Sequence, residues 1–517
     1  MTKRTTKFMT ALSLAVIVFA GINCFAATGV LVNAAGSTGA FNAMALAADN
    51  ATSICGTHIW TKKNGGSGID NRSPSIPANT ANIWIVWNTK QNTVCSYLAV
   101  DSVIGQQLFF AVPHSTLSIP SAEIGTAGDG LVATLTDEPL PAAIYGLLNN
   151  AQFNAAPSDI RPEDALFEAN RVLAPLDTVK YTGLGYGPGP IGTTILTSQG
   201  SGKSVTPVAY AISGNDPISG LPVAPYKTTN VGAQAIIFFV NTSDASTGGF
   251  GTSAYGNVSR FALADMLNGN LTRTRDIANQ TGLPSIGAHV FLREPTSGTY
   301  TTTEFTIPRS VEIGSTQELN VNPSAPGGNP LNISYASGGT RQRVIGTGEM
   351  VSTVGAVPDS LGYAFWSTTT FAKVISTTKY LSVDGVDPLF PTYLLSNGIF
   401  PTCTAPCPGA VPFTNIANGS YPAWNILRVV TASPVPKSVA TLITQAQTQV
   451  ANVTPDFLPL GALQVFRAHY SQSGIGAHDG FSGKSETGGD VGGAVFPIQA
   501  DLDFFTDTGK EILGQKQ

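Results

Sequence analysis

Residues 288–300, AHVFLREPTSGTY, constrain the fold most strongly, because a strand pattern changes there into the start of a helix. A mostly apolar run predicts a buried strand that leads into Arg293. A helix cap and first turn follow, with the residues Ser297, Gly298 and Thr299. This order brings a fixed cation close to the N–H donors of a helix N-terminus, an arrangement suited to an oxyanion. The alternative is that Arg293 pairs with the neighbouring Glu294 on a polar turn.

Strand and helix patterns alternate along the rest of the chain, which predicts α/β layers. We expect strands at residues 29–35, 231–241 and 361–366, and helices at 36–48, 261–270, 347–357 and 438–450. A Trp-bearing stretch from residue 57 to 113 favours further strands, and we include 107–112, QLFFAV, among them.

Composition limits the functional classes. The chain has 517 residues and a formal net charge of -5, so it lacks the basic surface typical of nucleic-acid binding. Only 11% of the residues are charged, with 55 Gly and 34 Pro, which is typical of an exported protein with long loops. The length favours more than one compact unit.

The N-terminal residues 1–27 have the pattern of a secretory signal peptide: a basic start, an apolar run and small residues at Ala26 and Ala27. Cys24 raises the alternative of a lipid anchor, although the residues before it fit that signal poorly. No later stretch reaches the roughly 18–20 apolar residues of a membrane span. We therefore expect a periplasmic or extracellular mature chain.

Four cysteines remain in that mature chain: Cys55, Cys95, Cys403 and Cys407. An oxidising compartment permits three pairings, and we favour Cys55 with Cys95 and Cys403 with Cys407. A metal site is the competing interpretation, but the histidines are scattered along the sequence, so we expect structural disulfides and no metal.

Three further polar positions are candidates for ligand contact. Ser37 and Thr38 follow the strand at 29–35 and can donate at a helix N-terminus, or serve as an ordinary cap. Asp159 ends an extended segment, where it either caps a helix or accepts a proton from a ligand. Ser67 lies in a polar loop and either faces a ligand or is solvated.

Seven motifs in order resemble the type II periplasmic substrate-binding proteins, specifically the phosphate-binding component of the phosphate ABC transporter. They are AAGSTGAFN, SDIRP, FALADMLNGNLTRTRDI, REPTSGT, GTGEMVSTVGAVPDSLGYAFW, LSVDGVDP and NGSYPAWNILRVV. The resemblance implies two α/β lobes with mixed sheets, joined by two crossover strands. It places lobe 1 at residues 28–230 and 430–517, with a strand-rich insertion at about 72–150, and lobe 2 at 231–429.

The same resemblance implies an oxyanion held between the lobes, without a cofactor. Ser37 and Thr38 would donate from the first lobe, and Asp159 would accept a proton of hydrogen phosphate. The cradle in the second lobe would be Arg293, Ser297, Gly298 and Thr299. The family's second donor loop falls near Ser67, but the long interval before Asp159 leaves that role open.

The expected function is therefore capture of phosphate or a related oxyanion for uptake by an ABC transporter permease, and not catalysis. One alternative is a structural or surface protein that kept this fold and lost the ligand. Another is a secreted hydrolase, although the sequence has neither a GxSxG elbow nor a His/Asp cluster. If the pocket binds an anion, we expect Arg293→Ala to abolish binding and to leave thermal unfolding nearly unchanged.

Overall fold

The structure is a computed structural model. It describes residues 29–50, 54–63, 81–90, 92–111, 113–162, 164–165, 194–196, 202–204, 226–244, 248–252, 256–277, 286–294, 296–308, 317, 333–344, 346–402, 409–467, 471–472, 486–487 and 495–497.

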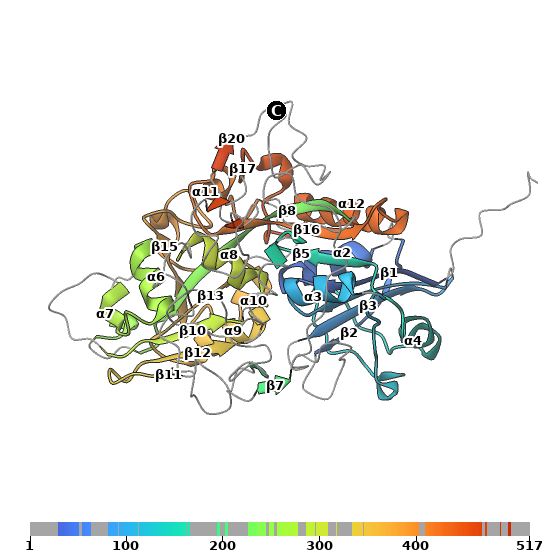
Figure 1. Cartoon of the computed structure of the whole chain (residues 1–517), viewed down its shortest axis with the longest axis horizontal. Coiled ribbons are helices and arrows are strands. Elements are labelled where there is room, and N and C mark those ends of the chain that lie inside the picture. Colours follow the sequence, from blue (N-terminus) through green and yellow to red (C-terminus); the bar gives the residue numbers. More distant parts are fainter. Residues whose placement is uncertain are drawn as a thin grey trace, which may run out of the picture.

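Two antiparallel strands, β8 (Tyr226–Asn241) and β16 (Trp424–Ala432), lie side by side in the middle of the molecule and pass from one half into the other (Figure 1). The first part of β8 pairs with β16, and its apolar second part pairs with β13 (Ser360–Phe365). Because β8 belongs to both halves of a 12-stranded mixed sheet, β8 and β16 join two lobes. The predicted two-lobe α/β architecture with crossover strands is confirmed.

The sheet of lobe 1 has the order β2–β3–β4–β1–β5–β16–β8. β1 lies parallel to β4 and β5, whereas β2, β3 and β4 are joined as antiparallel neighbours. The elements are β1 (Gly29–Gly36), η1 (Thr38–Ala40), α2 (Phe41–Ala48), β2 (His58–Lys63), β3 (Asn82–Asn88), β4 (Thr93–Ala99), α3 (Ser102–Phe110), η3 (Ser121–Glu123), α4 (Ala142–Leu148) and β5 (Ala155–Ser158).

The sheet of lobe 2 has the order β11–β12–β10–β13–β8, and β14 pairs with β8. β10 lies parallel to β12 and β13. The elements are η4 (Phe250–Thr252), β9 (Asn257–Val258), α6 (Arg260–Asn268), α7 (Thr274–Ile277), β10 (His289–Arg293), α8 (Gly298–Thr306), β11 (Ile333–Ser334), β12 (Thr340–Val344), α9 (Gly346–Ala356), α10 (Thr368–Phe371), β14 (Thr378–Tyr380), β15 (Ser382–Val383), η6 (Tyr393–Leu395) and α11 (Thr414–Ala417).

After β16 the chain returns to lobe 1 through α12 (Lys437–Asn452), which packs against α2. Its buried stripe, from Val439 to Val450, shares a core with Val32 and Met44 of the first lobe. Short elements complete the described chain: η7 (Leu460–Ala462) and the two-stranded pairs β6 (Thr194–Leu196) with β7 (Gly202–Ser204), β17 (Val465–Arg467) with β20 (Val495–Pro497) and β18 (Ser471–Gln472) with β19 (Glu486–Thr487).

One predicted strand is wrong. Residues 107–110 belong to the helix α3, and all nine residues of that helix are buried. An apolar run without a polar face gives no helical period, so a buried helix and a buried strand look alike in sequence. The described part of the strand-rich segment expected at about 72–150 lies in the first lobe, where β4 is a direct neighbour of β1.

The lobe boundaries at residues 230/231 and 429/430 fall inside β8 and β16, and we keep them as a proposal. Residues 1–28, including the expected signal peptide and Cys24, lie outside the described residues. Among the helices that the structure describes, none combines the length and the apolar character needed to cross a membrane.

Candidate functional site

Arg293 stands at the end of β10, and α8 begins a few residues later, as the sequence predicts. Ser297 is the N-cap of α8, and its hydroxyl accepts a hydrogen bond of 3.2 Å from the Thr299 backbone N–H. Gly298 and Thr299 form the first turn, and both are buried. A strand, a cation and a capped helix N-terminus therefore meet inside lobe 2.

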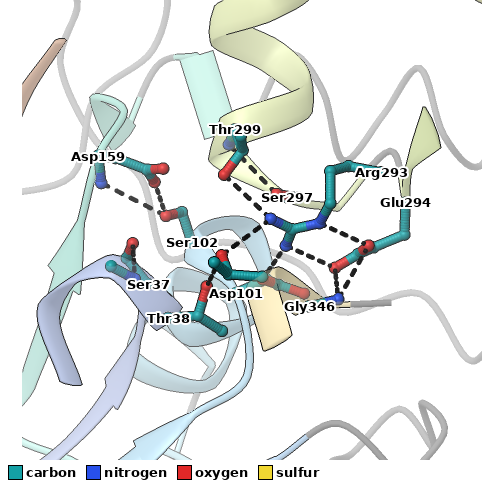
Figure 2. Close-up of polar contacts among 12 residues, drawn as sticks. Ser37, Thr38, Asp101, Ser102, Asp159, Arg293, Glu294, Ser297, Thr299 and Gly346 are labelled. Atoms are coloured by element: carbon teal, nitrogen blue, oxygen red, sulfur yellow. Dashed lines mark hydrogen bonds and ion pairs between the residues drawn. The ribbon is translucent and has the colours of Figure 1, made fainter. Parts of the chain in front are cut away.

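The Arg293 guanidinium is fully buried and surrounded by acceptors (Figure 2). Glu294 binds it through two hydrogen bonds, at 3.1 Å from Nε and 3.0 Å from Nη2. Nη1 donates to the hydroxyls of Thr299 and Thr347, each at 3.2 Å, and Nη2 also donates to Asp101 at 2.9 Å. The alternative pairing of Arg293 with Glu294 is thus present in the structure, next to the helix N-terminus.

Glu294 acts as the main counter-charge of Arg293. Burial has the largest single effect and raises the pKa of Glu294, but the Arg293 charge and the hydrogen bonds from Asp101, Arg293 and the backbone together outweigh burial, and the net pKa is lowered. The Glu294 carboxylate also accepts the Gly346 N–H, at 3.2 and 3.3 Å to its two oxygens. Glu294 is therefore ionised and anchored within its own lobe.

Asp159 follows β5 and points toward α8 from lobe 1 (Figure 2). The Ser102 hydroxyl donates to its carboxylate, and the Asn425 side chain donates to its backbone carbonyl at 2.7 Å. Burial raises the pKa of Asp159 to about 7, against the lowering effects of its backbone hydrogen bond, Arg293 and Arg428. A carboxyl group poised in this range can either donate or accept a proton.

Ser37 and Thr38 directly follow the end of β1 in lobe 1. The Ser37 hydroxyl accepts the Gly39 N–H at 3.2 Å and so caps η1. The Thr38 hydroxyl is 3.0 Å from that of Thr347 in lobe 2. The structure therefore brings Ser37, Thr38, Asp159, Arg293, Ser297, Gly298 and Thr299 to one region between the lobes.

The sequence interpretation missed Asp101 and Ser102. Asp101 lies between β4 and α3 at the N-cap position, and Ser102 is the first residue of α3. The signal was an Asp–Ser pair directly after an apolar strand, which is a helix-start pattern. The sequence pattern instead favours a strand at 107–112, which overlaps this helix and hides the helix start.

Three sequence-predicted positions lie outside the described residues: Ser67, Cys403 and Cys407. The predicted disulfide between Cys55 and Cys95 is confirmed, with an S–S distance of 2.11 Å. Within the described ranges, no group of three or more His, Cys, Asp or Glu side chains is placed to hold a metal ion.

No protein-family model matches the chain, and no curated protein matches it. Solved structures do. A phosphate-binding protein from Stenotrophomonas maltophilia is 12% identical, with 84% of this chain and 91% of that chain covered and a TM-score of 0.35. An ABC-type phosphate transport receptor from Vibrio cholerae is 16% identical, with 45% and 73% covered and a TM-score of 0.26.

A third structure, named as a phosphate ABC transporter substrate-binding protein from Clostridium perfringens, is 16% identical with a TM-score of 0.28. The match covers 43% of this chain and 66% of that chain, just under two thirds of its length. This chain resembles phosphate-binding proteins of ABC transporters.

Proposed function

We propose that this protein is an extracytoplasmic receptor that binds phosphate or a related oxyanion between its lobes and delivers it to an ABC transporter permease. In this proposal it is a binding protein and not an enzyme. The observation that carries the proposal is the convergence of Arg293, the N-terminus of α8 and the N-terminus of α3 on one buried region that also contains Asp159.

The donors suit an oxyanion. Helix N-termini offer backbone N–H groups and a positive dipole end, and Arg293 adds a permanent charge. Around them stand the hydroxyls of Ser37, Thr38, Ser102, Ser297 and Thr299. Hydrogen bonds to a charged ligand contribute roughly 1.5–3 kcal/mol each. A micromolar dissociation constant needs about 8 kcal/mol, so a few such bonds suffice.

Asp159 would select among oxyanions. An ionised carboxylate only accepts hydrogen bonds, so a ligand beside it must carry a proton, as hydrogen phosphate does and sulfate does not at neutral pH. A protonated Asp159 would lose that discrimination. The raised pKa of Asp159 therefore links selectivity to pH.

A second candidate function is a structural or surface role without oxyanion binding. The specific observation in its favour is that Arg293 already donates to Glu294, Asp101, Thr299 and Thr347. In this case phosphate finds no open donor on the guanidinium.

Isothermal titration separates the two functions. The protein is partially unfolded and refolded to remove bound anions, and phosphate and sulfate are titrated in parallel at pH 8. Micromolar or tighter phosphate binding with much weaker sulfate binding is the expected result. A folded protein that gives no heat with either anion would exclude the receptor function and favour the structural one.

A further inference from the structure

Asp101 links the two lobes through a hydrogen bond with Arg293. It lies between β4 and α3 in lobe 1, and its Oδ1 is 2.9 Å from Nη2 of Arg293 at the end of β10 in lobe 2. Both side chains are buried, at 6% and 0% exposure. Two neutral contacts cross the lobes beside it: the Val103 N–H donates to the Thr296 carbonyl at 3.2 Å, and the hydroxyls of Thr38 and Thr347 meet.

The backbone at Asp101 is unusual, with φ of 76° and ψ of 158°. This region favours glycine, and a residue with a side chain is held there only when its surroundings compensate for the strain. The Asp101 carboxyl group makes such compensating bonds, with Arg293 at 2.9 Å and with Glu294. A side chain at this position thus has a specific use.

The donors of Arg293 can be assigned one by one. A guanidinium has five N–H groups, and here the Nε group and one Nη2 group donate to Glu294, both Nη1 groups donate to threonine hydroxyls, and the second Nη2 group donates to Asp101. An oxyanion that binds Arg293 must therefore replace an existing acceptor.

Asp101 is the acceptor that can leave. Glu294 holds Arg293 with two bonds and is itself fixed by the Gly346 N–H of its own lobe. Asp101 holds Arg293 with one bond and is also hydrogen-bonded to Glu294. Because Asp101 belongs to the other lobe, both contacts break when the lobes separate. Glu294, in contrast, travels with Arg293.

We infer that the carboxyl group of Asp101 is a built-in competitor of the ligand: it occupies the oxyanion position on Arg293, holds the lobes together, and is displaced when an oxyanion binds. The inference rests on the proposed oxyanion site. It makes Asp101 a determinant of affinity, because each binding event exchanges an internal carboxyl group for an external anion.

The test compares Asp101→Gly and Asp101→Asn with the unchanged protein. Glycine removes the carboxyl group and the backbone strain together, whereas asparagine keeps the strained backbone and a neutral acceptor. The matched control is Asp384→Gly, because Asp384 also has a positive φ, of 51°, but is exposed, and its carboxylate accepts the backbone N–H of Arg260 and not a bond from Arg293. Phosphate affinity is measured by titration, and lobe separation by small-angle X-ray scattering in phosphate-free buffer.

We expect Asp101→Gly to bind phosphate at least tenfold more tightly and to have a larger radius of gyration without phosphate. Asp101→Asn is expected to fall between Asp101→Gly and the unchanged protein, and Asp384→Gly to match the unchanged protein. Unchanged affinity and scattering in both Asp101 variants, or weaker phosphate binding, would overturn the inference. If the Asp101 variants expand but no form of the protein binds phosphate, the contact between the lobes stands and the proposed function fails.

Discussion

The carboxylate of Asp159 lies directly against the backbone of Gly298. A Cβ atom at position 298 would be 2.8 Å from Oδ2 of Asp159 and closer still to Oδ1. The first residue of α8 in lobe 2 therefore has no side chain because the acidic group of lobe 1 occupies that space. This contact ties the predicted oxyanion cradle to the predicted proton acceptor.

The first prediction follows from this contact. Gly298→Ala forces the Asp159 carboxylate away from α8, and overpacking of this kind costs about 1–3 kcal/mol of unfolding free energy. The control is Gly348→Ala in α9, where an added Cβ meets no atom within 4 Å and the helix gains stability. Urea denaturation measures the unfolding free energy of both variants. Equal stability of the two variants would contradict the contact.

The second prediction concerns pH. Burial raises the pKa of Asp159 from 3.8 to about 7, so the folded protein keeps a proton that the unfolded chain releases near pH 4. The contribution of Asp159 to the unfolding free energy is therefore complete below about pH 4 and is lost as the pH rises through about 7. We expect the unfolding free energy to decrease between pH 5 and pH 8.

Asp159→Asn is the control for this pH effect, because the amide cannot titrate. The raised pKa of Asp101 acts in the same direction, so the slope should become smaller in the variant but not vanish. Chemical denaturation at several pH values measures the slope. An identical slope with and without Asp159 would show that its carboxyl group is already ionised in the folded protein.

Local sequence was sufficient to predict the strand and helix start that form the second-lobe part of the candidate site. Arg293 and Ser297 are close in sequence, and a strand end followed by a helix cap is a short-range pattern. Asp101 could not be found in the same way. It meets Arg293 across 192 residues, and the helix after it is buried on all sides and shows no amphipathic period.

The two-lobe architecture was predictable for a related reason. Apolar runs such as residues 231–241 and the amphipathic stripe of α12 report burial directly, so the element types followed from the sequence. How β8 divides its pairing between β16 and β13 depends on contacts with distant strands, and the resemblance to known proteins supplied that expectation.

The third prediction corrects an expectation from sequence. Arg293→Ala should not leave unfolding unchanged, because Arg293 is fully buried and its removal leaves Glu294 and Asp101 without a cation. Breaking a buried pair in this way costs about 3–5 kcal/mol. Phosphate binding is expected to be lost as well, as measured by titration.

The double variant Arg293→Met with Glu294→Gln is the control for charge. It removes both members of the main ion pair and keeps similar volumes, so its loss of unfolding free energy should be smaller than that of Arg293→Ala. An Arg293→Ala protein within about 1 kcal/mol of the unchanged protein would contradict the buried network.

The fourth prediction concerns the disulfide between Cys55 and Cys95, which are separated by 40 residues and fully buried. Closing a loop of that length stabilises a fold by about 4 kcal/mol in the chain-entropy description. Replacing both cysteines with alanine should lower the unfolding free energy by about 2–4 kcal/mol. Because β4 keeps its full ladder to β1, Asp101 and Ser102 should stay in place and phosphate affinity should not change. Denaturation of the unchanged protein with and without reductant is the control, and a reductant effect that persists in the double alanine variant would show that another bond carries the stabilisation.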